Sequence, residues 1–306
     1  SDVCSSDLGS GRKPGVPRVH TRSGYRTPPG RLGNNGPMDE SSRRIVRFVT
    51  EFNESRLTDA VVKAFNRTMI DSMAAVISGF EEEPVRISAR LAQDAQPASG
   101  RMKATVFGYG IATTPELAAF ANGVQVRMTD FNDNPHTSNI IPGILAIGEA
   151  LHCTGTQVMT AIVLGYEIAR LGAGESIAPA MGAGKLMGLD EDRLANALTM
   201  ALTPHVALNK GEGALSMWKG VRSAEATKCG IWAAILARAG MTGPPQPFEG
   251  PGGLWSVNGR RNVKLPVEDK LAIELNWFKA RPAEASSQGT LTLIPERSEE
   301  HTSELQ

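Results

Sequence analysis

Apolar residues recur at helical spacing along most of this chain, and that pattern limits the fold more than any other feature. Between residues 57 and 78, for example, Val61, Phe65 and Met69 return every four positions. Such spacing is typical of amphipathic helices. The same spacing and local signals predict helices at 40–52, 57–78, 84–93, 116–128, 140–153, 155–171, 179–187, 190–202 and 216–239. One segment, 104–107, is a good strand candidate, so we predict a mainly α fold.

Local signals set several of the expected helix ends. Thr114 followed by Pro115 predicts a helix start, with a capping threonine and a proline at the first helical position. Asp190 is expected to cap the helix that follows it. The segment 240–253 is dense in glycine and proline and is predicted to be a loop. Helices rich in alanine and glycine, such as 179–187, are expected to pack closely.

Composition excludes several classes of function. The 306 residues carry 32 basic and 32 acidic side chains, and a net charge of zero gives no support to nucleic-acid binding. No apolar run reaches the about 20 residues that cross a bilayer without interruption by polar groups. Cys153 and Cys229 are isolated in the sequence, which argues against a disulfide framework. These features predict a cytoplasmic protein that does not associate with membranes.

The two ends of the chain do not look like protein sequence. Residues 1–8 and 297–304 can be encoded by DNA strings that are reverse complements of each other. We therefore expect 1–8 and 297–306 to derive from a sequencing adapter, and 9–37 to be disordered or non-native, with Met38 as the start. The expected domains are a helical one at 38–262 and the start of a truncated second domain at 263–296.

A polar loop opens directly into the apolar helix predicted at 140–153. Within ten residues it holds Asp130, Asn132, Asp133, Asn134 and His136. Titratable groups at the mouth of a buried helix are where acid–base chemistry is usually sited. His136 is the first candidate for proton transfer, because an unperturbed imidazole pKa of about 6.5 suits work near neutral pH. The alternative for His136 is a helix-capping or solvated histidine.

Several short motifs, taken together and in order, resemble those of the MmgE/PrpD family, which includes 2-methylcitrate dehydratases and cis-aconitate decarboxylases. They lie at 130–134, 136–139, 161–167, 216–220, 240–244 and 279–284. The resemblance implies a helical domain and a smaller α/β domain that together close the active site. It also implies a homodimer that needs no metal or other cofactor and acts on a small tricarboxylate substrate.

The same resemblance implies roles for particular residues. His136 corresponds to the family's motif histidine and would transfer a proton. Asp130 corresponds to the first acid of the other motif and would orient the histidine or bond the substrate hydroxyl. Asn134 stands where the family usually has threonine and would donate a hydrogen bond to substrate. Asn132 and Asp133 are expected to turn the loop.

Cations for the substrate carboxylates are expected from two further segments. Lys219 lies in the first turn of a predicted helix, where the helix dipole disfavours a positive charge. The resemblance implies that it pairs with a substrate carboxylate, and the alternative is a lysine exposed at the surface. Arg222, one turn along, is expected on a similar face. Lys279, before the Pro-Ala turn, is a further candidate ligand. Tyr166 is predicted to be a core residue with a satisfied hydroxyl.

These assignments predict a carbon–oxygen lyase of the 2-methylcitrate dehydratase type, in propionate catabolism. The alternatives are a cis-aconitate-like decarboxylase or isomerase, and an inactive truncated helical fragment. The chain departs from the family in two places: a shortened loop at Asn134-Pro135, and no histidine between Arg170 and Gly182, where the family has one. We expect little turnover from the chain as given, because an open site does not exclude water.

Overall fold

The predicted helices are present in the structure, a computed structural model, and their ends agree with the predictions to within a few residues. Residues 37–95, 97, 99–204, 216–259, 263–266 and 268–294 are described. The two proposed adapter segments, and 9–36 before the helices, lie outside the described residues. The longer helices are α1 (Glu40–Glu51), α2 (Asp59–Gly79), α3 (Glu83–Asp94), α4 (Pro115–Met128), α5 (Ile141–Ala150), α6 (Gly155–Ala169), α7 (Ile177–Leu186), α8 (Glu191–Leu202) and α9 (Trp218–Arg238).

Side-chain caps fix several of the helix starts. The carboxylate of Asp190 accepts the backbone N–H of Arg193 at 2.9 Å, as the sequence predicted. Thr154 forms a capping box with Gln157 at the start of α6. At α4 the prediction was half wrong: Pro115 is in the first turn, but the Thr114 side chain makes no capping hydrogen bond. The fixed φ of the proline is what favours the helical start there.

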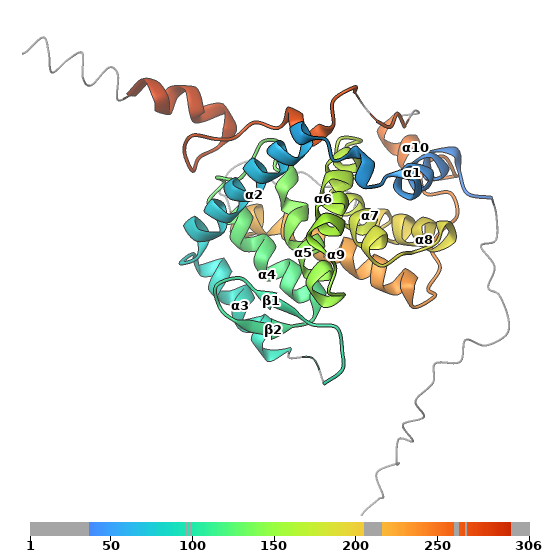
Figure 1. Ribbon diagram of the computed structural model, residues 1–306, viewed down its shortest axis with the longest axis horizontal. Coiled ribbons are helices and arrows are strands. Elements are labelled where there is room, and N and C mark those ends of the chain that lie inside the picture. The colour runs from blue at the N-terminus through green and yellow to red at the C-terminus, as the bar shows by residue number, and fades with distance from the viewer. Residues whose placement is uncertain are drawn as a thin grey trace, which may run out of the picture. The chain divides into compact units, whose positions relative to one another are not determined.

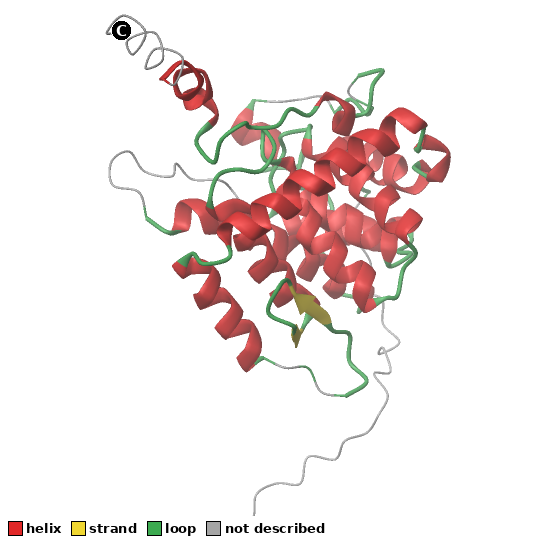
Figure 2. Ribbon diagram, turned by 60° about the vertical axis from the view of Figure 1, so that its left-hand side comes forward, coloured by secondary structure: helices red, strands yellow, loops and turns green. Residues whose placement is uncertain are grey.

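The predicted strand is β1 (Ala104–Val106), and it pairs with a second strand that the sequence analysis missed. β2 (Ile111–Thr113) runs antiparallel to β1, with Ala104 opposite Thr113. Three residues are too few to show a period of two, so β2 is defined by its partner rather than by its own pattern. Figure 2 shows these two short strands, in yellow, next to the surrounding helices.

Small residues let the central helices approach closely. Helix α4 lies at the centre and packs against α5 and α9 (Figure 1). A Cβ added at Gly123 of α4 would come within 2.9 Å of the Cβ of Ala224 on α9. A Cβ at Gly182 of α7 would come within 2.5 Å of Ile144 on α5. The predicted close packing of alanine- and glycine-rich helices is therefore confirmed, and it places the end of α4 beside the start of α9.

The chain after α9 returns to the helical core. Helix α10 (Leu254–Asn258) lies beside α1 (Figure 1), where the indole N–H of Trp255 donates to Ser41 at 2.9 Å. The short helix η3 (Ala272–Leu275) packs against α2 and α6, and η4 (Ala285–Ser287) follows it. Two further short helices, η1 (Glu54–Arg56) and η2 (Thr137–Ile140), lie earlier in the chain. The boundary near residue 262 stays a prediction.

Within the described residues, no helix is both long and apolar enough to cross a membrane.

Candidate functional site

The polar loop between α4 and α5 is held in an unusual backbone conformation. Asp130 and His136 both have positive φ angles, 54° and 72°. Non-glycine residues adopt such angles only where the surroundings enforce them, and these positions concentrate at functional sites. Inside the loop, the fully buried carboxylate of Asp133 accepts the Ser138 backbone N–H at 3.0 Å and the Ser138 hydroxyl at 2.5 Å.

Asp133 also joins the loop to two other parts of the chain. Its second oxygen accepts the hydroxyl of Tyr166 on α6 at 2.9 Å, and it accepts a hydrogen bond from the amide of Asn276, which follows η3. Four donors therefore compensate one buried carboxylate. The structural role predicted for Asp133 is confirmed, and so is the satisfied hydroxyl predicted for Tyr166. The residue that the sequence analysis missed is Asn276.

Hydrogen bonding fixes which nitrogen of His136 faces the site. The Asn132 amide donates to Ser138 at 2.8 Å, so its oxygen is the acceptor left for His136 Nδ1, at 3.1 Å. A neutral imidazole that donates from Nδ1 presents an unprotonated Nε2. Nε2 lies 3.4 Å from the carboxylate of Asp130. His136 is thus oriented to take up a proton on Nε2 and to hold it against Asp130.

Asp130 is the centre of a cluster of cationic side chains, defined here as the Asp130 cluster. Its Oδ1 lies 2.8 Å from Arg127, 2.6 Å from Lys279 and 3.4 Å from His136, and its Oδ2 lies 3.8 Å from Lys219. Burial acts to raise the pKa of Asp130, but the Lys279 hydrogen bond and the charges of Arg127, Lys279 and, when it is protonated, His136 outweigh it. The pKa of Asp130 is therefore held below its usual range, and the carboxylate stays ionised.

The members of the Asp130 cluster differ in their access to solvent. The side chains of Lys279 and Arg127 are 0% and 6% exposed, whereas those of Lys219 and His136 are 32% and 23% exposed. Lys279 also bonds the Asp130 carbonyl at 2.6 Å. Arg127 and Lys279 therefore fix Asp130 from within. Lys219 and His136 are the more solvent-accessible members of the cluster.

The structure brings together most, but not all, of the residues that the sequence analysis named. Asp130, His136, Lys219 and Lys279 meet in the Asp130 cluster. Arg222 does not share the carboxylate with Lys219: its guanidinium pairs with Glu175 at 2.6 Å, on the connection between α6 and α7. Because i and i+3 side chains diverge by about 60° around a helix, these two cations reach different neighbours.

Asn134 is tied to the segment after η3 through its backbone. Its N–H donates to the carbonyl of Trp277 at 3.0 Å in an isolated antiparallel bridge. This bridge, together with the Lys279 and Asn276 bonds, holds the segment 276–279 against the loop. Arg127 was missed by the sequence analysis, although its position three residues before Asp130, in the last turn of α4, was a usable signal.

Asp71 on α2 is a further acid that the sequence analysis missed. Burial and the nearby charge of Asp133 raise its pKa to about 6, while the backbone N–H of Asp133 and the charge of Lys279 act to lower it. Its Oδ2 is buried without a hydrogen-bond partner. A carboxyl with a pKa of about 6 therefore interacts with Asp133 and Lys279, although it lies 62 residues before Asp133 in the chain.

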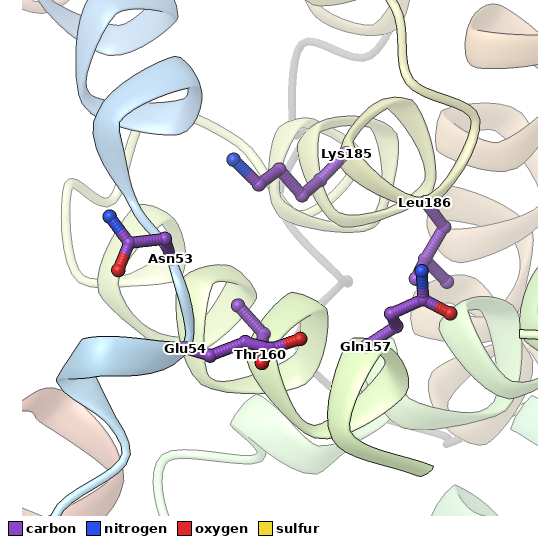
Figure 3. A pocket seen from close by; sticks show the side chains of 6 residues that line it. All are labelled: Asn53, Glu54, Gln157, Thr160, Lys185 and Leu186. Atoms are coloured by element: carbon purple, nitrogen blue, oxygen red, sulfur yellow. The ribbon is translucent and has the colours of Figure 1, made fainter. Parts of the chain in front are cut away.

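The described part of the chain contains two cavities, and neither is lined by a residue of the Asp130 cluster. One, of about 390 Å³, lies between η1 and helices α6 and α7, and is lined in part by Lys185 and Glu54. Lys185 extends toward the end of α1 (Figure 3), where its ammonium donates to the carbonyls of Val49 and Thr50 at 2.9 and 3.1 Å. Lys185 therefore caps α1. The second cavity, of about 440 Å³, lies behind the loop at Pro135 and Thr137.

Comparisons with known proteins give one matching family model and several relatives. The model of the MmgE/PrpD N-terminal domain matches residues 43–175 and 170–264, in two pieces that overlap at 170–175, within the stretch where the chain lacks the expected histidine. Cis-aconitate decarboxylase of Homo sapiens is 27% identical, over 63% of this chain and 45% of that protein. The Aspergillus oryzae cis-aconitate decarboxylase-like protein oryM is 24% identical, over 79% and 57% respectively. The chain spans about half the length of these relatives.

Proposed function

Because this chain belongs to the MmgE/PrpD family, we propose that it supplies the helical part of a lyase that acts on a small tricarboxylic acid. The observation that carries the proposal is the Asp130 cluster. An oriented histidine and an accessible lysine meet there at one ionised carboxylate. Proton transfer next to a bound carboxylate needs these two kinds of group.

The geometry supports a division of labour within the cluster. Arg127 and Lys279 keep Asp130 ionised and in place. The Nδ1 atom of His136 is bonded to Asn132 at 3.1 Å, and its Nε2 lies 3.4 Å from Asp130. Nε2 is therefore the nitrogen that exchanges a proton with the substrate. Lys219 is the cation for a substrate carboxylate. For Lys279, holding Asp130 replaces the direct substrate contact that the sequence suggested, because its side chain is fully buried.

Two reactions use this arrangement. In decarboxylation of a cis-aconitate-like acid, the bond from carbon to carboxylate breaks, its electron pair stays on carbon, and His136 donates the proton that replaces CO₂. In dehydration of a 2-methylcitrate-like acid, a base takes the proton beside a carboxylate, the C–O bond breaks, and the leaving hydroxide is protonated. The names of the relatives favour decarboxylation, and dehydration remains the second candidate. We also propose a homodimer, as in the family.

The test is product analysis by proton NMR on the protein encoded by the complete locus, with cis-aconitate and 2-methylcitrate as substrates. His136→Gln is expected to lower kcat/KM by about 100-fold or more, the usual contribution of general acid–base catalysis. His152→Gln is the matched control, because His152 is exposed at the end of α5, and it is expected to change kcat/KM less than twofold. Full activity in His136→Gln would refute the assignment.

A further inference from the structure

The cavity of about 440 Å³ has walls from three separate parts of the chain. The loop after α4 contributes Pro135 and Thr137, the end of α6 contributes Tyr166 and Arg170, and the η3 segment contributes Leu275 and Asn276. Its volume lies within the range of about 300–1,000 Å³ that is usual for small-molecule sites. It is lined by both polar and apolar groups, so it suits a ligand that has both.

Arg170 supplies the positive charge of this cavity. It is the C-cap residue of α6, where the helix dipole favours a cation. The guanidinium pairs with Glu268, and the two side chains are 31% and 51% exposed. Ion pairs that are this exposed contribute little to stability, because water competes for both partners. Glu268 is therefore a weakly held carboxylate that another carboxylate is able to replace.

The remaining walls complement a small organic anion. The hydroxyl of Thr137 and the amide of Asn276 offer hydrogen-bonding groups, while Ala169 and Leu275 offer apolar surface. Asn276 and Tyr166 are also the side chains that hold the buried carboxylate of Asp133. A ligand against this wall thus contacts the groups that fix the loop bearing Asp130 and His136.

We propose that this cavity binds a small carboxylate with a short aliphatic body, with the carboxylate on Arg170 in place of Glu268. The carboxylate belongs either to a separate small acid or to the far end of the substrate of the Asp130 cluster. Binding of a separate acid does not depend on the function proposed above, because Arg170 is not part of the Asp130 cluster, whereas binding of the far end of the substrate rests on that function.

The experiment is calorimetric titration of the full chain with 2-methylsuccinate, with the neutral 2-methylsuccinamide as the control ligand. Arg170→Gln is expected to weaken 2-methylsuccinate binding about tenfold or more, as for loss of charge-assisted hydrogen bonds. Glu268→Gln removes the competing carboxylate and is expected to tighten binding several-fold. Glu268 is exposed, so this variant tests the site even if Arg170→Gln does not fold.

The variant Lys219→Gln distinguishes ligand binding in this cavity from ligand binding at the Asp130 cluster. It is expected to leave 2-methylsuccinate binding unchanged while it weakens cis-aconitate binding; unchanged cis-aconitate binding would count against the proposed function alone. Competition between cis-aconitate and 2-methylsuccinate would assign the cavity to the far end of the substrate, and independent binding to a separate acid. The cavity site would be overturned by any of three results. The first is that 2-methylsuccinamide binds as tightly as 2-methylsuccinate, and the second is that neither Arg170→Gln nor Glu268→Gln changes 2-methylsuccinate binding. The third is that Lys219→Gln loses 2-methylsuccinate binding.

Discussion

Asp71 is expected to make the folded protein less stable at neutral pH than an uncharged residue would. Its pKa is raised from 3.8 to about 6, mainly by burial and by the charge of Asp133. Without solvent screening, a pKa change of that size corresponds to about 3 kcal/mol of folding free energy. The side chain is only half-buried, and solvent screening reduces the expected effect to about 1–1.5 kcal/mol.

The sign of this effect follows from proton linkage. The folded state holds the Asp71 proton more tightly than the unfolded chain does, so its contribution to stability is fully present below pH 3.8. The contribution is lost as the pH rises through about 6. Asp71→Asn removes the titration and keeps an oxygen for the Asp133 backbone N–H. The variant should therefore gain stability relative to the parent between pH 4 and pH 7, and the gain should then level off.

Urea unfolding followed by circular dichroism, at intervals from pH 4 to pH 8, measures this difference. Asp59→Asn is the control, because Asp59 lies on the same helix and is exposed. Its stability difference from the parent should stay constant between pH 5 and pH 8. A difference for Asp71→Asn that is constant over the whole range, or that favours the parent at pH 7, would refute the reasoning.

Three further outcomes are expected. Tyr166→Phe removes one donor from the buried Asp133 carboxylate and should lower the free energy of unfolding by about 1–3 kcal/mol. The control is Tyr109→Phe, which removes only a 3.4 Å contact with the Phe80 carbonyl and should cost less than about 0.5 kcal/mol. Equal costs of the two variants in thermal melts would contradict this prediction. Lys279→Met removes one of the two buried cationic partners of Asp130, the other being Arg127, and should cost about 3 kcal/mol. Lys219→Met should leave the melting temperature nearly unchanged and weaken tricarboxylate binding. Gly123→Val should destabilise by about 1–3 kcal/mol because a side chain there meets Ala224, and an unchanged melting temperature would argue against the close α4–α9 contact.

Several features of the site followed from local sequence alone. Helical periodicity and capping residues located the helices, because both signals act over a few neighbouring residues. The density of polar residues between 130 and 139 located the loop at the centre of the site. Family motifs then named Asp130, His136, Lys219 and Lys279, which the structure gathers around one carboxylate. The strand β2 escaped prediction because its partner, rather than its own residues, defines it.

The sequence by itself determined the helical class of this protein, the positions of its helices and the loop that bears its candidate acid–base groups. The tertiary structure decided which side chains share an environment. It buries Lys279 and Arg127 against Asp130. It pairs Arg222 with Glu175 and not with the Asp130 cluster. It also brings Asp71 and Asn276 to Asp133 from distant parts of the chain. The physical reason is that periodicity and caps are properties of neighbouring residues. Burial and charge–charge distance are set instead by segments that meet only when the chain folds.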